Sequence, residues 1–273
     1  MKSRKRQAYT VIAVIMMLVF IASTVAGTKA VVAGRDQEKP VNVVDVPVLN
    51  YHKVDTLHHA LSVLPENFEQ QMAYLHDNGY HTVTPDQLMA YLKHGSPLPE
   101  NPVMITFDDG YLDNYANAFP SMKKYGFTGT IFLVTGKIGQ DQRFMNWEQV
   151  REMQQAGFVF GSHTVNHVAL SKIDNEQLET ELTESREEME RQLGQKPRYF
   201  AYPTGAYNLQ IEQAVRQAGY RAAFTVRYGQ AGPDSDPYAV ERIPIFQSDN
   251  TFRSFLFRLR GASLLERLGL IRN

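Results

Sequence analysis

The sequence alternates between short strand-like runs and longer helix-like segments over most of its length. The strand-like runs are apolar, and some segments between them, such as 65–79, have apolar residues at helical spacing and end at glycine. Repeated units of this kind place parallel strands in one sheet with the helices outside. The pattern therefore predicts an α/β fold, either a barrel or a doubly wound sheet. The predicted strands are 46–52, 81–83, 102–107, 128–134, 158–160, 198–202, 221–226 and 240–246, and the predicted helices are 65–79, 85–94, 113–124, 147–155, 175–193 and 209–218.

Length and composition limit the classes to which the chain can belong. Its 273 residues, 43% of them hydrophobic, suffice for one large α/β domain or two small ones. The net charge of −1 does not indicate a nucleic-acid binder. The absence of cysteine excludes disulfides, thiolate metal sites and a cysteine nucleophile, and leaves histidine, aspartate and glutamate as metal ligands.

The N-terminus predicts export across a bacterial membrane. Basic residues within 2–6 precede an uncharged, mostly apolar run over 8–26, which is the pattern of a signal peptide or signal anchor. A helix over this run, at about 1.5 Å per residue, nearly spans the hydrocarbon core of a bilayer. We therefore assign 1–26 to a signal anchor or signal peptide, 27–45 to a spacer and 46–273 to one folded domain outside the membrane, either anchored through 8–26 or secreted.

The C-terminal tail predicts a further helix. Phe252, Phe255 and Leu259 recur at helical spacing, with arginines between them. A closing helix packed on the domain is the simpler interpretation, and a helix lying on a membrane surface is the alternative.

Two adjacent carboxylates end one of the apolar predicted strands. The run 103–107 leads into Asp108, Asp109 and Gly110. Adjacent residues at a strand end point in different directions, so that one acid can bind a metal while the other accepts a proton from water. An Asp-Gly turn without chemical function is the simpler interpretation of this dipeptide taken alone.

A pair of histidines favours the metal interpretation. His163 and His167 follow the apolar run 158–160 and are four residues apart, either on one helical face or on a loop after the strand. With one carboxylate they form a ligand set that leaves coordination positions open, as in catalytic zinc or non-haem iron sites. The candidate reactive residues all fall just beyond predicted strand ends, where parallel α/β folds hold their active sites; they are His52, Asp108, Asp109, His163 and Thr204.

These two stretches together carry a specific family resemblance. Thr106-Phe107-Asp108-Asp109-Gly110 and Ser162-His163-Thr164-Val165-Asn166-His167 resemble the first two motifs of the polysaccharide deacetylases, the NodB-homology domains of carbohydrate esterase family 4. Over about residues 46–260 the resemblance implies a distorted (β/α) barrel that hydrolyses acetamido groups of a sugar polymer. It also implies a divalent metal, zinc first and cobalt, nickel or iron as alternatives. By position, Asp108 is the expected general base, and Asp109, His163 and His167 are the expected metal ligands.

The third family motif, Arg-x-Pro-Tyr-Gly, is altered in this chain. The matching stretch 201–205 has alanine in place of the arginine and Thr204 in place of the tyrosine. Pro203 and Gly205 keep the turn, and the resemblance implies that the Thr204 backbone N–H helps to hold the developing oxyanion. With Tyr111, Pro203 and Gly205 are the residues expected to line the substrate site. We expect Arg242 to replace the missing arginine, with Arg198 as second candidate; a strand-edge ion pair is the simpler interpretation of Arg242.

The late Leu-x-His motif that usually supplies the general acid is absent, because no histidine follows His167. Leu49-Asn50-Tyr51-His52-Lys53-Val54, however, resembles an N-terminal motif of the branch that deacetylates poly-β-1,6-N-acetylglucosamine, the biofilm adhesion polysaccharide. Residues 200–203 and 242–245 are also similar to that branch. This resemblance implies that His52, on the first strand, is the proton donor.

The expected function is metal-dependent removal of acetyl groups from N-acetylglucosamine units of an extracellular polysaccharide, poly-β-1,6-N-acetylglucosamine first. Deacetylation of peptidoglycan in the cell wall is the alternative substrate. A membrane-anchored carbohydrate-binding protein without catalysis is the alternative class, because two family motifs are incomplete. A metal-dependent phosphoesterase also uses strand-end acids; a glycosidase needs two carboxylates about 5–10 Å apart and gives the histidine pair no role.

Overall fold

The computed structural model describes residues 44–57, 59–245 and 252–267, apart from the side chains of 262–267. The predicted signal segment and nearly all of the predicted spacer lie outside the described residues, so their assignment stays a prediction. Among the described residues, no helix combines the length and the apolar character needed to cross a membrane.

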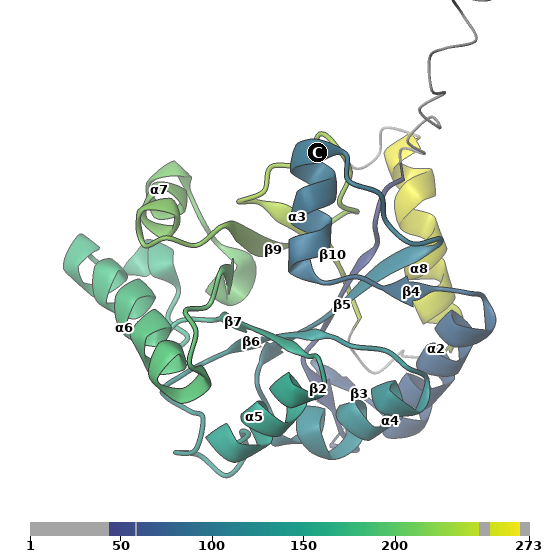
Figure 1. Ribbon diagram of the computed structural model, residues 1–273, viewed down its shortest axis with the longest axis horizontal. Helices are drawn as coiled ribbons and strands as arrows, with labels where there is room; N and C mark the ends of the chain where they lie inside the picture. The colour runs from purple at the N-terminus through teal and green to yellow at the C-terminus, as the bar shows by residue number, and fades with distance from the viewer. Residues whose placement is uncertain (1–43, 58, 246–251, 268–273) are drawn as a thin grey trace, which may run out of the picture. The chain divides into compact units, whose positions relative to one another are not determined.

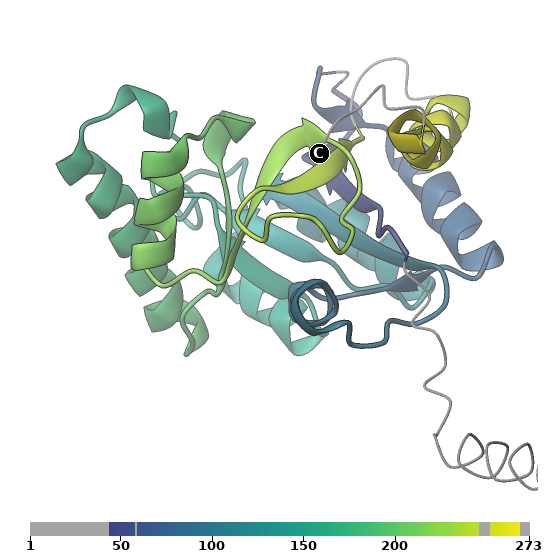
Figure 2. The same cartoon turned by 90° about the horizontal axis from the view of Figure 1, so that it is seen from above.

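Seven parallel strands of the described chain close into a ring. In order around the ring they are β1 (Val48–Tyr51), β10 (Val240–Pro244), β9 (Ala222–Tyr228), β8 (Tyr199–Ala201), β7 (Val159–Ser162), β6 (Thr130–Leu133) and β5 (Pro102–Asp109). The ring is closed because β1 pairs with β5 as well as with β10. Of the two predicted architectures, the fold is therefore a distorted (β/α) barrel and not a doubly wound sheet (Figures 1 and 2).

Three further short strands lie beside this ring. β4 (His81–Thr82) pairs with the first residues of β5, just before the register at which β1 begins to pair with β5. β2 (Lys53–Val54) and β3 (Ser62–Val63) pair only with each other in the described chain, in the connection that follows β1. The sequence did not predict β2 and β3, because two-residue strands carry no periodicity.

Helices surround the barrel, and local sequence signals fix many of their ends. Thr84 and Asn146 each begin a helix with a reciprocal capping box, and Gly95 and Gly194 end two helices in the left-handed conformation that glycine adopts without strain. The helices are α2 (Pro65–Asp77), α3 (Pro85–His94), α4 (Phe119–Lys124), α5 (Trp147–Gln155), α6 (Asn175–Leu193), α7 (Leu209–Gln217) and α8 (Phe252–Arg267), with short turns η1 (Asn114–Ala118), η2 (Leu170–Lys172) and η3 (Pro203–Gly205).

One predicted helix is irregular. The segment predicted as a helix over 113–124 contains the π-helical turn η1 over 114–118 and is a regular α-helix from Phe119. Pro120 follows at once, and a proline has no N–H with which to continue the regular hydrogen-bond ladder. The π-helical turn η1, which is wider than an α-helical turn, lies directly before the helix that contains Pro120, whose nitrogen carries no hydrogen to donate.

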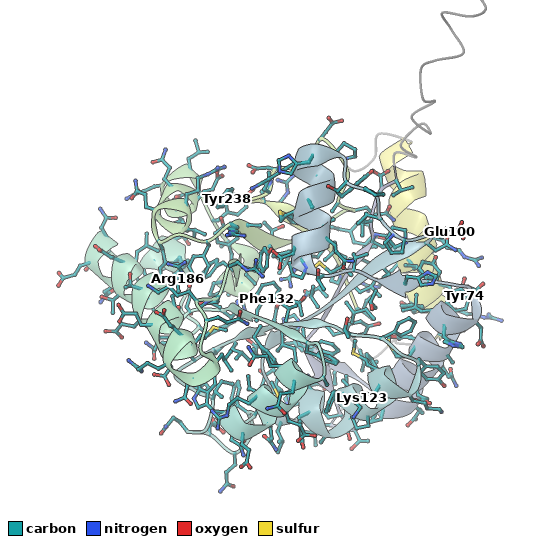
Figure 3. All side chains as sticks on the ribbon, in the orientation of Figure 1. Tyr74, Glu100, Lys123, Phe132, Arg186 and Tyr238 are labelled. Atoms are coloured by element: carbon teal, nitrogen blue, oxygen red, sulfur yellow. The ribbon has the colours of Figure 1, made fainter. Side chains whose placement is uncertain are left out.

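Apolar side chains of the barrel strands and of α3 close the amino-terminal end of the barrel, and one of them, Phe132, reaches the level of Asp108. Phe132 lies near the middle of the structure in Figure 3 and packs against Phe224, with ring centroids 5.1 Å apart. Met104 and Val240 belong to the same buried cluster, and Leu88 of α3 covers it. This end is therefore closed by packing, which leaves the carboxyl-terminal ends of the strands for polar side chains.

A second cluster joins the barrel to the outer helices. Phe68 and Met72 of α2 are fully buried, as their helical spacing predicted. Phe255 and Leu259 of α8 belong to the same cluster, and α8 lies beside α2 in Figures 1 and 2. The tail thus packs as a closing helix; Phe257, on the other side of α8, is exposed.

We predict opposite effects for alanine at two glycines. A Cβ on Gly161 of β7 would lie 2.6 Å from the Phe132 ring and 2.8 Å from the Tyr199 carbonyl, so Gly161→Ala should lower the free energy of unfolding by about 1–3 kcal/mol. Among the described side chains, the Phe257 ring is the one near Gly261 of α8, at 3.9 Å, so Gly261→Ala should raise the free energy of unfolding by up to about 1 kcal/mol through helix propensity. Urea denaturation measures both; equal effects would contradict the packing argument.

Candidate active site

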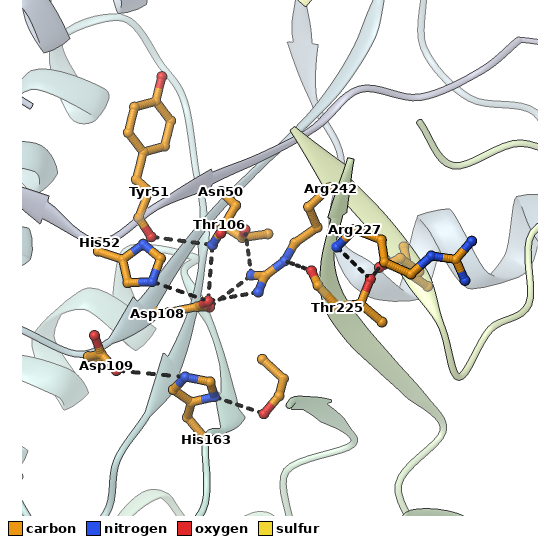
Figure 4. Close-up of polar contacts among 12 residues, drawn as sticks. Asn50, Tyr51, His52, Thr106, Asp108, Asp109, His163, Thr225, Arg227 and Arg242 are labelled. Atoms are coloured by element: carbon orange, nitrogen blue, oxygen red, sulfur yellow. Dashed lines mark hydrogen bonds and ion pairs between the residues drawn. The ribbon is translucent and has the colours of Figure 1, made fainter. Parts of the chain in front are cut away.

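Polar side chains from several barrel strands converge at the carboxyl-terminal end of the ring (Figure 4). Asp108 and Asp109 end β5, His52 directly follows β1, and His163 directly follows β7. Arg242 reaches the same place from β10. Because all ring strands are parallel, residues that the sequence places up to 190 positions apart meet at one edge.

The Asp108 carboxylate is held by three side chains. Arg242 donates from Nη1 to Oδ1 at 2.8 Å and from Nη2 to Oδ2 at 2.7 Å, which is a two-pronged ion pair. Asn50 donates from Nδ2 to Oδ2 at 3.1 Å, and His52 Nε2 lies 3.8 Å from the same oxygen. Asp108 is 1% exposed. Its orientation is therefore fixed by contacts on both carboxylate oxygens.

Arg242 is fully buried and hydrogen-bonded beyond the ion pair. Its Nε donates to the Thr225 carbonyl at 2.7 Å, and Nη1 also donates to Thr106 Oγ1 at 3.2 Å. Of the two arginines considered from the sequence, Arg242 contacts Asp108, whereas Arg198 pairs with Asp86. The expected contact between Arg242 and Asp108 is thus present, and it is buried in the barrel and not an ion pair at a strand edge.

Arginine keeps Asp108 ionised. Burial alone would raise the pKa of this carboxyl, but the positive charge of Arg242, with a smaller effect of His163, lowers the pKa well below its usual range. A buried ion pair with saturated hydrogen bonds is costly to desolvate and costlier to break. Asp108 is consequently a carboxylate at neutral pH, able to accept a proton.

Asn50 is a site residue that the sequence analysis missed. It lies one residue before Tyr51 in β1 and is 1% exposed. The signal was present, because side chains two apart on a strand share a face, and Asn50 is two residues before His52. Asn50 is a polar residue in an otherwise apolar strand, and it lies on the same strand face as His52. Both features mark Asn50 as a candidate site residue.

Asp109, His163 and His167 form a second group beside Asp108. Each offers one ligand atom, and these atoms lie within 4.8 Å of one another. His163 Nε2 is 3.7 Å and His167 Nε2 is 3.3 Å from Asp109 Oδ1. The two histidines lie on the loop after β7 and not on a helix, so the loop alternative of the sequence analysis describes them.

The tautomer of His163 suits a metal ligand. Its Nδ1 lies 2.8 Å from the Ala201 carbonyl, and because a carbonyl only accepts, Nδ1 carries the hydrogen. The lone pair is then on Nε2, which faces Asp109. His167 has its side chain 37% exposed, so this side of the group is open to solvent and to a substrate.

The donor chemistry of this group fits a divalent metal. Burial raises the pKa of Asp109, an effect that the neighbouring His163 only partly offsets. Burial also lowers the pKa of His163 and of His167, which favours the neutral rings that metals bind. One buried carboxylate and two neutral imidazoles, open on one side, match a catalytic zinc or iron site and not a closed structural one.

Backbone strain is concentrated at the site. Asp109, Thr164, His167 and Thr204 have φ values of 75°, 68°, 58° and 61°, in the left-handed region. Each costs on the order of 1–2 kcal/mol for a residue other than glycine. Within the described part of the chain, only Asn101 among the other non-glycine residues has such a φ.

The remaining predicted residues lie on the loop after β5 and on the turn after β8. The Tyr111 ring stacks on Phe144 with ring centroids 4.8 Å apart, and Lys53 Nζ lies 4.3 Å from the centroid of the Tyr111 ring. Pro203, Thr204 and Gly205 form η3, directly after β8. A Cβ on Gly205 would lie 2.2 Å from a Val226 methyl, so this turn requires glycine. Their roles toward a substrate stay predictions.

The chain matches the family model of polysaccharide deacetylase over residues 95–223. This stretch contains the two aspartates and the histidine pair but neither β1 nor β10, which carry His52 and Arg242. The putative polysaccharide deacetylase YxkH of Bacillus subtilis is 36% identical over 208 residues, which cover 76% of this chain and 73% of the relative.

Two further similarities extend over most of the domain. The poly-β-1,6-N-acetyl-D-glucosamine N-deacetylase of Staphylococcus aureus is 26% identical over 291 residues, which cover 96% of this chain and 98% of the relative. The structure of the Streptococcus pyogenes deacetylase PplD in complex with acetate is similar with a TM-score of 0.75 and 28% identity, covering 80% of this chain and 99% of that one.

We predict that Arg242→Met destabilises the metal-free protein by about 3–5 kcal/mol, because it leaves a buried carboxylate unpaired. The double variant Asp108→Asn/Arg242→Met should lose less stability than Arg242→Met alone, since no buried charge then remains unpaired. Urea denaturation in the presence of a chelator measures both. Arg143→Met, which removes an exposed pair with Asp141, is the control and should unfold like wild type. A double variant that is at least as destabilised as Arg242→Met alone would contradict the pairing.

Proposed function

Because this chain belongs to the polysaccharide deacetylase family, it is a hydrolase of carbon–nitrogen bonds, and we propose that it deacetylates N-acetylglucosamine units of an extracellular polysaccharide. The observation that carries this proposal is the ionised Asp108 beside the Asp109–His163–His167 group at the mouth of the barrel. Poly-β-1,6-N-acetylglucosamine is the proposed polymer, supported by the full-length similarity to the S. aureus enzyme.

A divalent metal, which we propose to be zinc, would be held by Asp109, His163 and His167. When bound, such an ion polarises an amide carbonyl and lowers the pKa of water. The residues around the metal position accept, donate or orient the protons that the reaction moves. A carbohydrate-binding role without catalysis would require none of this arrangement.

Asp108 acts as the general base. Its lowered pKa keeps it free of a proton at neutral pH, and the two prongs of Arg242 fix the carboxylate plane. It accepts the proton of the attacking water as the tetrahedral centre forms. Arg242 is in this scheme a positioning residue, because it acts on the substrate only through Asp108.

His52 acts as the proton donor to the departing amine. Burial lowers its pKa, although the charge of Asp108 opposes this effect. The resting ring is therefore neutral, and in this proposal it takes up the proton that Asp108 accepted from the water and passes it to the departing amine. The Asp108 carboxylate, 3.8 Å from Nε2, stabilises the protonated ring while it is needed.

The turn after β8 and Tyr111 complete the proposed site. The Thr204 N–H helps to hold the oxyanion, and the left-handed backbone at this residue supports such a special orientation. Tyr111, Pro203 and Gly205 bind the sugar beside the reacting amide. We also propose that the domain begins at residue 46 and works outside the cytoplasmic membrane, supported by the basic and apolar pattern of residues 2–26.

The function is tested by acetate release from β-1,6-linked N-acetylglucosamine oligomers and from peptidoglycan fragments. Each substrate is assayed with chelated protein and again after zinc is restored. We expect zinc-dependent release from the β-1,6 oligomers. Release from peptidoglycan alone would keep the reaction and replace the polymer, and no release from either by zinc-loaded protein would contradict the proposed function.

His52→Ala should reduce kcat by about a hundredfold or more while zinc binding is kept, since acid–base groups contribute on this scale. Steady-state rates and zinc affinity are measured together. His76→Ala, on the exposed side of α2, is the matched control and should keep wild-type rates. A loss of less than about tenfold in His52→Ala would assign the donor role to another group.

A further inference from the structure

Glu181 differs from its neighbours on α6. This helix is rich in glutamate, and its composition predicted a face exposed to solvent. Glu179, Glu184 and Glu187 are indeed exposed, but Glu181 is only 6% exposed. A charged side chain that is this deeply buried requires partners, and these partners lie on the loop between the two histidines.

The Glu181 carboxylate accepts three hydrogen bonds from two consecutive residues. Oε2 accepts from the Val165 N–H at 2.8 Å and from the Asn166 N–H at 3.0 Å, and Oε1 accepts from Asn166 Nδ2 at 2.7 Å. Hydrogen bonds to an ionised acceptor are shorter and about twice as strong as neutral ones. Both residues lie between His163 and His167, so the carboxylate binds the chain that joins the two ligands.

The same loop is held from its other side by β6 and the residues after it. The Thr164 carbonyl accepts from Thr135 N at 3.0 Å, and the Val165 carbonyl accepts from Gly136 N at 2.9 Å. A Cβ on Gly136 would lie 2.7 Å from that Val165 oxygen. The peptide groups between the histidines are thus held between the segment that follows β6 and helix α6.

The conformation that is clamped is strained. Thr164 and His167 both have positive φ, and the His167 N–H closes the turn on Thr164 Oγ1 at 2.9 Å. Strained backbone persists only where the surrounding structure over-determines it. One helical turn after Glu181, Ser185 Oγ lies 2.8 Å from Ser162 Oγ, so α6 is also fixed to the end of β7 itself.

We propose that Glu181 is a positioning residue for the metal site: through Val165 and Asn166 it holds the strained loop in the one conformation in which His163 and His167 both face Asp109. The inference rests on the proposed metal-dependent function. It assigns α6 a part in that function that its exposed glutamates do not share.

The test measures zinc affinity of the metal-stripped full chain by equilibrium competition with a fluorescent chelator. Glu181→Ala is expected to weaken zinc binding by about 10–100-fold, the usual effect of losing a partner of a ligand group. Hydrogen exchange at the Val165 and Asn166 amides should accelerate in the same variant. Glu187→Ala, an exposed glutamate of the same helix, is the matched control and should change neither quantity.

Glu181→Gln keeps the shape and one acceptor oxygen, and it decides the question if the alanine variant does not fold. We expect an intermediate loss of zinc affinity, with the metal-free thermal midpoint close to that of Glu187→Ala. Wild-type affinity in the folded Glu181 variants would overturn the proposal, and so would a wild-type chain that binds no zinc. If wild type binds zinc and the variants bind it weakly, but no substrate releases acetate, the positioning role stands and the proposed function fails.

Discussion

The buried pair of Asp108 and Arg242 is the interaction on which the site depends. Neither side chain has contact with solvent, so the pair is tolerable only because each polar atom has a partner from a different strand. Arg242 contacts β9 through Thr225 and β5 through Thr106 and Asp108. The pair therefore links strands on both sides of β1 at the mouth of the barrel.

Two neighbouring aspartates acquire opposite properties from this arrangement. Asp108 faces a guanidinium and has a lowered pKa, whereas Asp109 faces imidazoles and has a raised pKa because burial dominates. When the pKa values of two neighbouring carboxyl groups are shifted in opposite directions, the groups can take distinct chemical roles. Asp109 ends β5 with a φ of 75°, so its side chain leaves the regular alternation of the strand and lies beside Asp108 in different surroundings.

The sequence predicted what depends on local signals and on the family motifs. The bounds of α3, α5 and α6 agree with the prediction because caps and glycines mark their ends. It did not predict Asn50 or Glu181 as site residues, because their surroundings are set by strand register and by the docking of a helix. In the sequence, Glu181 looks like the exposed glutamates of the same helix. It differs from them only because it is buried in the folded structure.

Closure of the ring has a consequence for how the protein matures. Asp108 and Arg242 are 134 positions apart, and Arg242 lies on the last strand of the described chain. A nascent or partly folded chain can contain both aspartates and both histidines and still lack the guanidinium beside which Asp108 is buried as a carboxylate. Asp108 therefore acquires its buried ion pair, and with it a fixed carboxylate orientation, only when β10 completes the barrel.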